Sequence, residues 1–262
     1  MSQSSHPSVS LHPEHAWLNS ELGHYLQQEE QVLYDQAVVD LFGFNALQVG
    51  CLQMDLLRNS RIANKFKSTE SVLSPEFTHL YCNDDFLPFA DASLDMLILP
   101  HRLEFSERPH QTLREAERVI MPEGHLLISG FNPLSLWGLA LFFRNLLLKR
   151  READKPFPWC GSFIGLGRLK DWLALLGFEV VSVHMCCHIP PFEQASWHHR
   201  FRFMHQLGVK WLSAIGGVYF IVAKKRVMGM TPLKPSWKKV PVKAPMVVRP
   251  TQRKPSQRER AD

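Results

Sequence analysis

The sequence has no apolar run long enough to cross a membrane. Its most apolar stretch, residues 134–148, is about fifteen residues long and includes Arg144 and Asn145, whereas a spanning helix needs roughly 20 apolar residues. The amino-terminal residues are rich in Ser, His and Pro and lack the charged start and apolar stretch of a signal peptide. We therefore expect no transmembrane segment and no secretory signal.

Cysteine is scarce and its number is odd, which argues against a disulfide framework. The five residues are scattered, mostly inside apolar runs: Cys51, Cys82, Cys160, Cys186 and Cys187. Reduced thiols used as small hydrophobic side chains are typical of cytosolic proteins. His184 and His188 bracket two of the cysteines, but alternate side chains of a strand face opposite sides, and no second Cys or His pair stands at zinc-site spacing. We expect a cytoplasmic protein without a metal site.

Positive charge is unevenly distributed along the chain. Residues 227–262 contain nine Lys or Arg and two acidic residues, a net charge of +7, which leaves about −2 for residues 1–226 against the total of +5. The same segment is interrupted by prolines and cannot bury enough apolar surface to fold alone. We expect residues 1–16 to be a flexible leader, residues 17–226 to form a single domain, and residues 227–262 to be a disordered basic tail.

The basic tail has the charge to bind an anionic partner weakly, such as RNA or lipid. Its one aromatic residue, Trp237, gives no support for base stacking. The alternative is a solvated tail that serves solubility.

The middle of the chain has the pattern of a strand, a helix and a second strand. A polar loop, residues 83–87, precedes the apolar run Met96 to Leu99, which is too short for a helix and ends at Pro100. A charged amphipathic helix over residues 111–119 and a second apolar run over residues 126–129 follow. This order with short turns predicts a parallel βαβ unit. The polar loop then lies at the carboxyl edge of the sheet, where ligands bind.

The flanking segments supply the remaining elements of an α/β domain. Ser20 is expected to cap a helix whose apolar positions keep helical spacing up to Phe42, and Gly43 closes it. Further expected elements are a strand over 46–51, a weaker helix over 54–65, helices over 135–151 and 168–176, and strands over 178–183 and 217–223.

One side of the predicted sheet is too short for the regular pattern. Two short strands, residues 71–73 and 78–82, are separated only by residues 74–77. Neighbouring parallel strands require a crossover of about a dozen residues. This edge is therefore expected to be a hairpin, a rearranged loop or a sheet short of one strand.

Several separated motifs resemble one known family. Leu87-Pro88-Phe89, Asp95 to Ile98, Leu113-Arg114-Glu115 and Arg118 to Gly124 are similar, in order and spacing, to the core of class I S-adenosylmethionine-dependent methyltransferases of the type 11 kind. The resemblance spans roughly residues 40 to 185. It implies an α/β fold with a seven-stranded Rossmann-like sheet, helices on both faces and an antiparallel last strand. The shortened region between the second and third strands departs from that pattern. The resemblance also implies that S-adenosylmethionine binds at the carboxyl edge of the sheet.

The turn after the first predicted strand departs from the family pattern. Such a turn usually carries several glycines, which let the backbone approach the ligand. Here Gly50 is retained, the other glycines are absent, and Gln48 stands near the position of the usual acidic residue. Leu52 and Met54 are expected to bring side chains into the space of the donor's amino-acid portion. Gly50 is the expected cofactor contact, and an ordinary turn without a cofactor is the alternative.

The other expected cofactor contacts follow the third and fourth strands. Asn83 or Asp84 falls where the family places the polar group that reads the adenine amine, and Phe86 can pack on the adenine ring. His101, just past the fourth strand, faces the cleft in the resemblance and is the candidate base or substrate contact. The alternatives are a solvated turn for residues 83–85 and a surface histidine for His101.

The segment after the fifth strand is expected to line the acceptor site. Asn132 follows that strand, and Trp137 begins the apolar stretch beyond it. The alternative for Asn132 is a loop-capping role before the helix that begins at Ser135. The stretch from Trp137 to Leu148 reads as core or as a lid over an apolar substrate, and with Lys149 to Arg151 at its end it also permits peripheral membrane contact.

Two functions from different classes are compatible with these features. The first is a methyltransferase that uses S-adenosylmethionine and acts on an apolar small-molecule acceptor, which the retained loop at residues 87–89 favours. The second is a methyltransferase-derived binding or regulatory protein that no longer binds the methyl donor, which the degraded glycine turn favours. Few signature catalytic residues are expected, because methyl transfer from a sulfonium is an in-line displacement in which the protein mainly supplies position.

Overall fold

The computed structural model describes residues 17–69, 80–148, 161–190 and 216–226 of the 262-residue chain, and of residues 144–148 the backbone alone. All of these residues belong to one compact unit, residues 1–227, and a second unit, residues 228–262, contains none of them. The predicted leader at residues 1–16 and the predicted basic tail at residues 227–262 lie outside the described residues.

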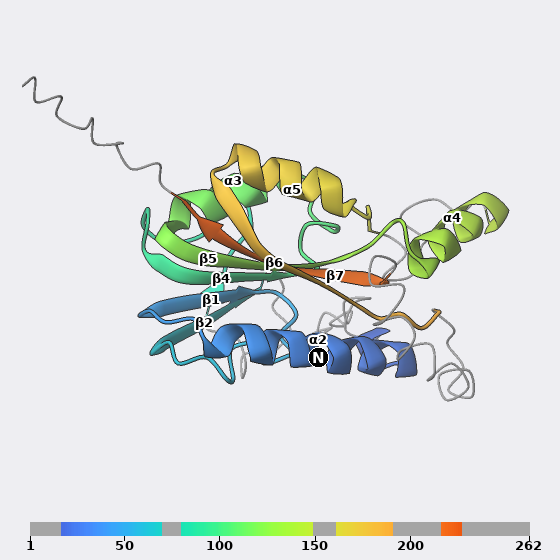
Figure 1. Ribbon diagram of the computed structural model, residues 1–262, viewed down its shortest axis with the longest axis horizontal. Helices are drawn as coiled ribbons and strands as arrows, with labels where there is room; N and C mark the ends of the chain where they lie inside the picture. The colour runs from blue at the N-terminus through green and yellow to red at the C-terminus, as the bar shows by residue number, and fades with distance from the viewer. Residues whose placement is uncertain (1–16, 70–79, 149–160, 191–215, 227–262) are drawn as a thin grey trace, which may run out of the picture. The chain divides into compact units, whose positions relative to one another are not determined.

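A seven-stranded sheet in the order β3-β2-β1-β4-β5-β7-β6 forms the centre of the domain (Figure 1). Its strands are β1 (Asn45–Val49), β2 (Asn64–Thr69), β3 (Leu80–Tyr81), β4 (Leu94–Pro100), β5 (Ile120–Phe131), β6 (Phe178–Cys186) and β7 (Val218–Lys225). The pairs from β3 to β5 are parallel, and β7 runs antiparallel to both of its neighbours. The predicted Rossmann-like sheet with an antiparallel last strand is confirmed.

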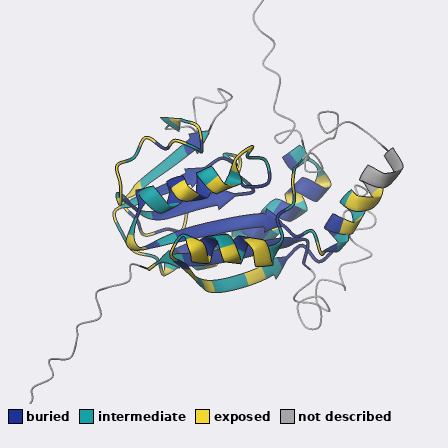
Figure 2. Cartoon of the chain, turned by 90° about the horizontal axis from the view of Figure 1, so that it is seen from above, coloured by how far each residue is buried: buried dark blue, intermediate teal, exposed yellow. Residues whose placement is uncertain are grey.

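Helices cover both faces of the sheet. In Figure 1, α2 (Glu21–Val39) lies on one face and α3 (Pro109–Val119) and α5 (Leu166–Leu175) lie on the other. Successive side chains of β4 alternate between the two cores: Met96 and Ile98 join the cluster that includes α2, whereas Leu97 and Leu99 join the cluster that includes α3 and α5. Because both faces are covered, the central strands are buried throughout, as Figure 2 shows in dark blue.

The predicted amino-terminal helix is confirmed in α2, which ends at Val39 rather than near Phe42. The Ser20 hydroxyl accepts a hydrogen bond from the Gly23 backbone N at 3.1 Å and caps the helix. The buried face repeats every four residues: Leu22, Leu26, Glu30, Tyr34 and Val38. One carboxylate therefore stands in the middle of an otherwise apolar stripe.

The predicted helix over residues 54–65 is wrong. Residues 50–63 form turns and irregular backbone, and β2 begins at Asn64. Leu56 and Leu57 are adjacent and both fully buried, and Ile62 is 2% exposed. In a helix, adjacent side chains point about 100° apart, so Leu56, Leu57 and Ile62 would not all lie on one buried face of a helix. The connection between β1 and β2 is a compact turn instead.

The sheet has all seven strands, including β2 and β3 on the side that the sequence predicts to be short. β2 occupies residues 64–69 instead of 71–73, and the two-residue β3 pairs with it in parallel, Ser68 with Leu80 and Thr69 with Tyr81. Residues 70–79 between them lie outside the described part of the chain. The parallel pairing of β2 with β3 excludes the hairpin that was one of the expected arrangements. This side of the sheet is shortened in two ways: β3 has only two residues, and the crossover before β2 contains no helix.

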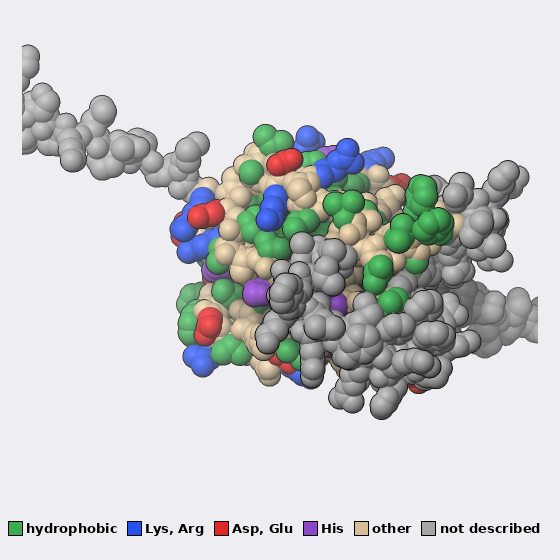
Figure 3. Space-filling model, turned by 45° about the vertical axis from the view of Figure 1, so that its right-hand side comes forward, with side chains coloured by type: hydrophobic (Ala, Val, Ile, Leu, Met, Phe, Trp, Pro, Cys, Tyr) green, Lys and Arg blue, Asp and Glu red, His purple; other side chains and the backbone are tan. Residues whose placement is uncertain are grey.

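α4 (Leu136–Leu148) follows β5 and exposes apolar side chains. Trp137 is fully buried and anchors the first turn, whereas Leu139, Phe142 and Phe143 are 48%, 61% and 49% exposed. Hydrophobic side chains gather at the right of Figure 3, where α4 lies. Contiguous exposed apolar surface of this kind marks contact with a ligand, a partner or a membrane. Among the described residues, no helix is both long enough and apolar enough to span a bilayer.

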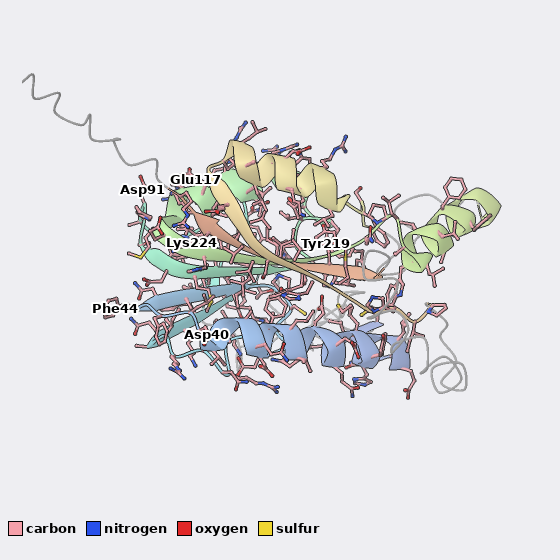
Figure 4. All side chains as sticks on the ribbon, in the orientation of Figure 1. Asp40, Phe44, Asp91, Glu117, Tyr219 and Lys224 are labelled. Atoms are coloured by element: carbon pink, nitrogen blue, oxygen red, sulfur yellow. The ribbon has the colours of Figure 1, made fainter. Side chains whose placement is uncertain are left out.

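Ion pairs gather at the amino edge of the sheet, opposite the ends of β1 and β4. Lys224 contacts Glu123 and Lys225 contacts Glu117, each at 2.8 Å. Figure 4 shows Glu117 and Lys224 at the same end as Phe44, which precedes β1. The antiparallel course of β7 brings its carboxyl end to this edge. These pairs join β7 to β5 and to the helix that covers the sheet, α3.

The motif on α3 holds the loop that precedes β4. The Glu115 carboxylate accepts a hydrogen bond from the Leu87 backbone N at 2.8 Å, and Arg118 donates to the carbonyls of Leu87 and Phe89 at 3.1 and 2.9 Å. Arg118 also contacts Glu115 at 2.6 Å, and this hydrogen bond lowers the pKa of the Glu115 carboxyl. The motif residues therefore act on the fold by fixing a loop.

Glu115→Ala is expected to lower the free energy of unfolding by about 1–3 kcal/mol, because it leaves the Leu87 N–H without its acceptor and removes one of the carboxylates that pair with Arg118. Folding lowers the pKa of Glu115, so its stabilisation is present above the unfolded pKa of about 4.3 and is lost as the pH falls through the folded pKa. Urea unfolding at pH 7 and pH 3 measures both effects. Glu107→Ala, at an exposed position before α3, is the control, and an equal loss in both variants would contradict the assignment.

Candidate functional site

The carboxyl ends of β1, β2 and β4 meet at one edge of the sheet, because β1 pairs in parallel with both neighbours. Gly50 follows β1, His101 and Arg102 follow β4, and residues 83–86 follow β3. In open parallel sheets this edge is where ligands bind. The predicted cofactor residues therefore all lie in loops at this edge of the sheet.

The Gln48 side chain organises the turn after β1. It is fully buried, and its Nε2 donates to the carbonyl oxygens of Gly50, Cys51 and Met54 at 3.2, 3.2 and 2.9 Å. Its Oε1 accepts a hydrogen bond from the Leu56 backbone N at 3.2 Å. A carboxylate has no proton to donate to three carbonyls. The geometry thus explains why an amide, and not an acid, stands at this position.

Arg102 lies over Gly50 and pairs with Asp84. Gly50 has a φ of +77°, and a Cβ on it would stand 2.7 Å from Arg102 Cδ and 3.3 Å from Arg102 Nε. Arg102 Nε donates to the buried Asp84 Oδ2 at 2.5 Å. The Met54 side chain instead packs in the core beneath α2, and Leu52 is half-buried. The side chain nearest the retained glycine is therefore an arginine.

The loop after β3 forms a tight polar turn. The exposed Asn83 accepts a hydrogen bond from the Asp85 backbone N at 2.8 Å, and Asp85 accepts one from the Thr112 hydroxyl at 3.1 Å. Phe86 is 68% exposed. Among the expected adenine contacts, only Asp84 is buried, and it pairs with the arginine that lies over Gly50. The assignments of Asn83, Asp84 and Phe86 to cofactor binding stay predictions.

His101 is held between two carboxylates. It has a φ of +50°, which turns its ring from the end of β4 toward α2. Its Nε2 lies 2.7 Å from Glu30 Oε1 of α2, and its Nδ1 lies 3.3 Å from Glu104 Oε1. All three side chains are buried, and the ring packs against Phe131 in a tilted arrangement, with 4.3 Å between centroids. His101 is thus a buried residue and not a surface loop histidine.

The two carboxylates keep His101 protonated. Burial by itself disfavours the charged ring, but the negative charges of Glu30 and Glu104 and their hydrogen bonds outweigh it and hold the pKa of His101 well above its usual value. A protonated ring has no lone pair with which to accept a proton. This arrangement favours a role for His101 in positioning the end of β4, and its assignment as a base stays a prediction.

Sequence reasoning missed three members of this edge: Glu30, Arg102 and Glu104. For Glu30 a signal was present, because it interrupts the four-residue repeat of apolar side chains on α2. A carboxylate on the buried stripe of a helix requires a partner. No sequence pattern indicates that Arg102 returns over Gly50, since the contact depends on the turn at His101.

The two expected acceptor residues are both buried. Asn132 donates from its Nδ2 to the Gly216 carbonyl at 3.1 Å and accepts from the Leu134 backbone N at 3.0 Å, which is a loop-capping pattern. Trp137 donates from Nε1 to the Ile189 carbonyl at 2.9 Å and stacks on Phe131. Both side chains therefore support the segment that leads into α4, and their contact with an acceptor is untested.

The cysteines near the end of β6 are free thiols. Cys186 and Cys187 are buried, and burial raises the pKa of the Cys187 thiol, so it stays protonated. Within the ranges that the structure describes, no three His, Cys, Asp or Glu side chains gather in a way that could hold a metal ion.

Comparison with known proteins points to one family. A family profile described as a methyltransferase domain matches residues 45–128. The uncharacterized protein YafS of Escherichia coli (strain K12) is 32% identical over 198 residues, which cover 75% of each chain.

Two solved structures have the same fold. One is an S-adenosylmethionine-dependent methyltransferase of Thermotoga maritima, described as a possible histamine N-methyltransferase, with 18% identity, a TM-score of 0.58, and 82% of this chain and 99% of that chain covered. The other is an S-adenosylmethionine-dependent methyltransferase of Archaeoglobus fulgidus, with 17% identity, a TM-score of 0.53, and 77% and 94% covered. At such identities the likeness shows the fold alone.

Gln48→Glu is expected to lower the free energy of unfolding by at least about 3 kcal/mol, because it places a buried carboxylate against three carbonyl oxygens. Urea unfolding at pH 7 measures the loss. Gln28→Glu, on the exposed side of α2, adds the same charge without burial and is expected to have little effect. A Gln48→Glu protein as stable as the parent would show that the amide does not hold the turn.

His101 is expected to remain protonated at pH 7.5, whereas burial and the nearby Lys224 lower the pKa of His125 and leave that ring neutral. Histidine ring chemical shifts followed by NMR against pH distinguish the two in one sample. Because folding raises the pKa of His101, its stabilisation is fully present below about pH 6.5 and is lost as the pH rises through the folded value. Glu30→Gln is expected to lower the pKa of His101, and an unchanged titration would contradict the pairing.

Proposed function

The chain belongs to the class I S-adenosylmethionine-dependent methyltransferase family, and on this premise we propose that it transfers the methyl group of S-adenosylmethionine to an apolar small-molecule acceptor. One observation carries the proposal. The three atoms nearest to a Cβ placed on Gly50, at the carboxyl end of β1, all belong to the flexible side chain of Arg102.

The residues of this edge fit the donor on one condition, which is that Arg102 moves. Gly50 has no Cβ, and the nearest atoms above it belong to the long side chain of Arg102. We propose that rotation of that side chain opens space above Gly50. Gly50 and Asp84 would then hold the donor from below and from the side. The exposed ring of Phe86 and the amide of Asn83 would meet the adenine at the rim.

The charge of this edge supports a cationic ligand. His101 supplies one positive charge between the two carboxylates of Glu30 and Glu104. The second oxygens of both carboxylates are buried and have no hydrogen-bond partner among the described residues. The donor, when bound, supplies an electrophilic methyl group on a positively charged sulfur. Excess negative potential at the edge favours such a ligand, and the chain's own role is to orient it and to exclude water.

The surface of α4 supports an apolar acceptor. The helix follows the carboxyl end of β5, so it lies beyond the same edge as Gly50 and His101. Leu139, Phe142 and Phe143 leave much of their surface in water. Covering such side chains with an apolar molecule stabilises the complex by about 25 cal/mol per Å² removed from water.

Two further assignments accompany the proposal. We place the reaction in the cytoplasm, which the reduced state of the cysteines in the described part of the chain supports. We also propose that residues 227–262, with a net charge of +7, bind weakly to an anionic partner such as RNA or lipid.

S-adenosylhomocysteine, the demethylated donor, is expected to raise the melting temperature by roughly 5–10 °C at 100 times its dissociation constant, since it adds about 2.7 kcal/mol of stability. Gly50→Ala is expected to abolish this rise, because its Cβ enters the space that the ligand needs. Each variant is compared with its own melting temperature without ligand.

Gly177→Ala is the matched control for backbone strain. Gly177 also has a positive φ, +80°, but a Cβ there would meet only the Arg226 carbonyl oxygen at 3.5 Å. Both variants therefore carry similar strain, and only Gly50→Ala is expected to lose the ligand response. A parent protein without any shift at millimolar ligand would overturn the proposal in favour of a protein that no longer binds the donor.

A further inference from the structure

The first turn of α4 is fixed to the body of the domain. The Ser135 hydroxyl accepts a hydrogen bond from the Gly138 backbone N at 3.1 Å. Trp137 is fully buried, donates from its indole N to the Ile189 carbonyl at 2.9 Å and stacks on Phe131. Beyond this turn the helix extends away from the sheet (Figure 1). The domain therefore holds the start of α4 in place and presents the rest of the helix to its surroundings.

The second turn of α4 leaves three large apolar side chains in water. Leu139, Phe142 and Phe143 are exposed, and their spacing of three and four residues places them on one face of the helix. The rings of Phe142 and Phe143 pack edge to face, with 5.8 Å between centroids. Contiguous exposed apolar surface marks a place of contact with another molecule.

The described apolar face of α4 is small for a stable protein interface. Phe142 and Phe143 leave 61% and 49% of their surface in water, which is roughly 200 Å² for the two rings. A stable dimer buries about 800 Å² on each partner. A membrane surface needs neither that area nor a matching shape, because a few apolar side chains can enter the boundary between headgroups and acyl chains.

The length of α4 limits how far it can enter a bilayer. The helix has 13 residues and is therefore roughly 20 Å long, whereas the hydrocarbon core of a bilayer is about 30 Å thick. A helix of this length lies in the interface and does not cross it.

The charges of this part of the sequence identify the kind of membrane. Residues 134–151 contain no acidic residue and four cationic ones, Arg144, Lys149, Arg150 and Arg151. Lys149 to Arg151 follow directly on Leu148, the last residue of α4, so the covalent chain keeps them close to the end of the helix. Lys and Arg beside an apolar helix are attracted to anionic lipid headgroups, and a neutral apolar partner would make no use of them.

We propose that α4 docks the protein on an anionic phospholipid surface. Leu139, Phe142 and Phe143 enter the boundary between headgroups and acyl chains, and the cations of residues 144–151 supply the attraction to the headgroups. The inference goes beyond the proposed function and does not rest on it. An apolar acceptor dissolved in the same bilayer would reach the protein at this helix.

Flotation of the full chain with lipid vesicles tests the docking. Vesicles of phosphatidylcholine with about 30% phosphatidylglycerol are expected to bind the parent protein at least about 10-fold more tightly than vesicles of phosphatidylcholine alone. Phe142→Ser combined with Phe143→Ser is expected to weaken binding to the anionic vesicles by about 10-fold or more, because it removes the apolar surface. Its melting temperature is expected to stay at or above that of the parent, since both rings are exposed.

Phe42→Ser combined with Phe44→Ser is the matched control, because these rings are also exposed, by 66% and 74%, and lie just before β1 at the other edge of the sheet. It is expected to bind the vesicles as the parent does. If the variant with Phe142→Ser and Phe143→Ser binds as well as the parent, another part of the chain, such as residues 227–262, carries the binding and the docking of α4 is wrong.

Three other results would also overturn the docking. The first is a parent protein that binds neither kind of vesicle, and the second is an equal loss of binding in both double variants. The third is a parent that is dimeric by light scattering while the variant with Phe142→Ser and Phe143→Ser is monomeric, because a second copy of the chain would then cover α4. None of these results bears on donor binding, which the melting experiment with S-adenosylhomocysteine tests separately.

Discussion

A single buried amide, that of Gln48, holds the edge on which the site is built. Its hydrogen bonds to the turn at residues 50–56 replace the backbone bonds that a crossover helix would make within itself. The turn includes positive φ values at Gly50 and Cys51, of +77° and +49°. A side chain therefore fixes the backbone path of this turn.

The charges of the edge follow from the conformation of one residue. His101 adopts a positive φ, which costs roughly 1–3 kcal/mol for a residue with a side chain. That turn directs the imidazole into the core beneath α2 and leaves Arg102 to return over Gly50. Each cation meets carboxylates from a different part of the chain, Glu30 and Glu104 for one and Asp84 for the other. The strained turn is thus stabilised by two sets of ion pairs, and it places Arg102 over Gly50.

The sequence predicts the parts of the fold that depend on local pattern. The run Met96 to Leu99 indicates a strand buried on both faces, and Ser20 with its following apolar repeat indicates α2. The crossover after Gly50 does not form the predicted helix. Its conformation depends on a tertiary contact with Gln48, and no local sequence pattern shows that contact. The same holds for Arg102, whose place over Gly50 depends on the backbone of His101. Of these residues, only Glu30 could have been identified from the sequence, because it is a carboxylate within the apolar stripe of a helix.

A crystal structure of the protein with S-adenosylhomocysteine tests most directly whether this edge accepts the donor. We expect the ligand to lie across Gly50, the Arg102 side chain to have moved away from Gly50, and the Gln48 bonds to the turn to be unchanged. A complex in which the ligand binds elsewhere while Arg102 still lies over Gly50 would contradict the proposed donor site.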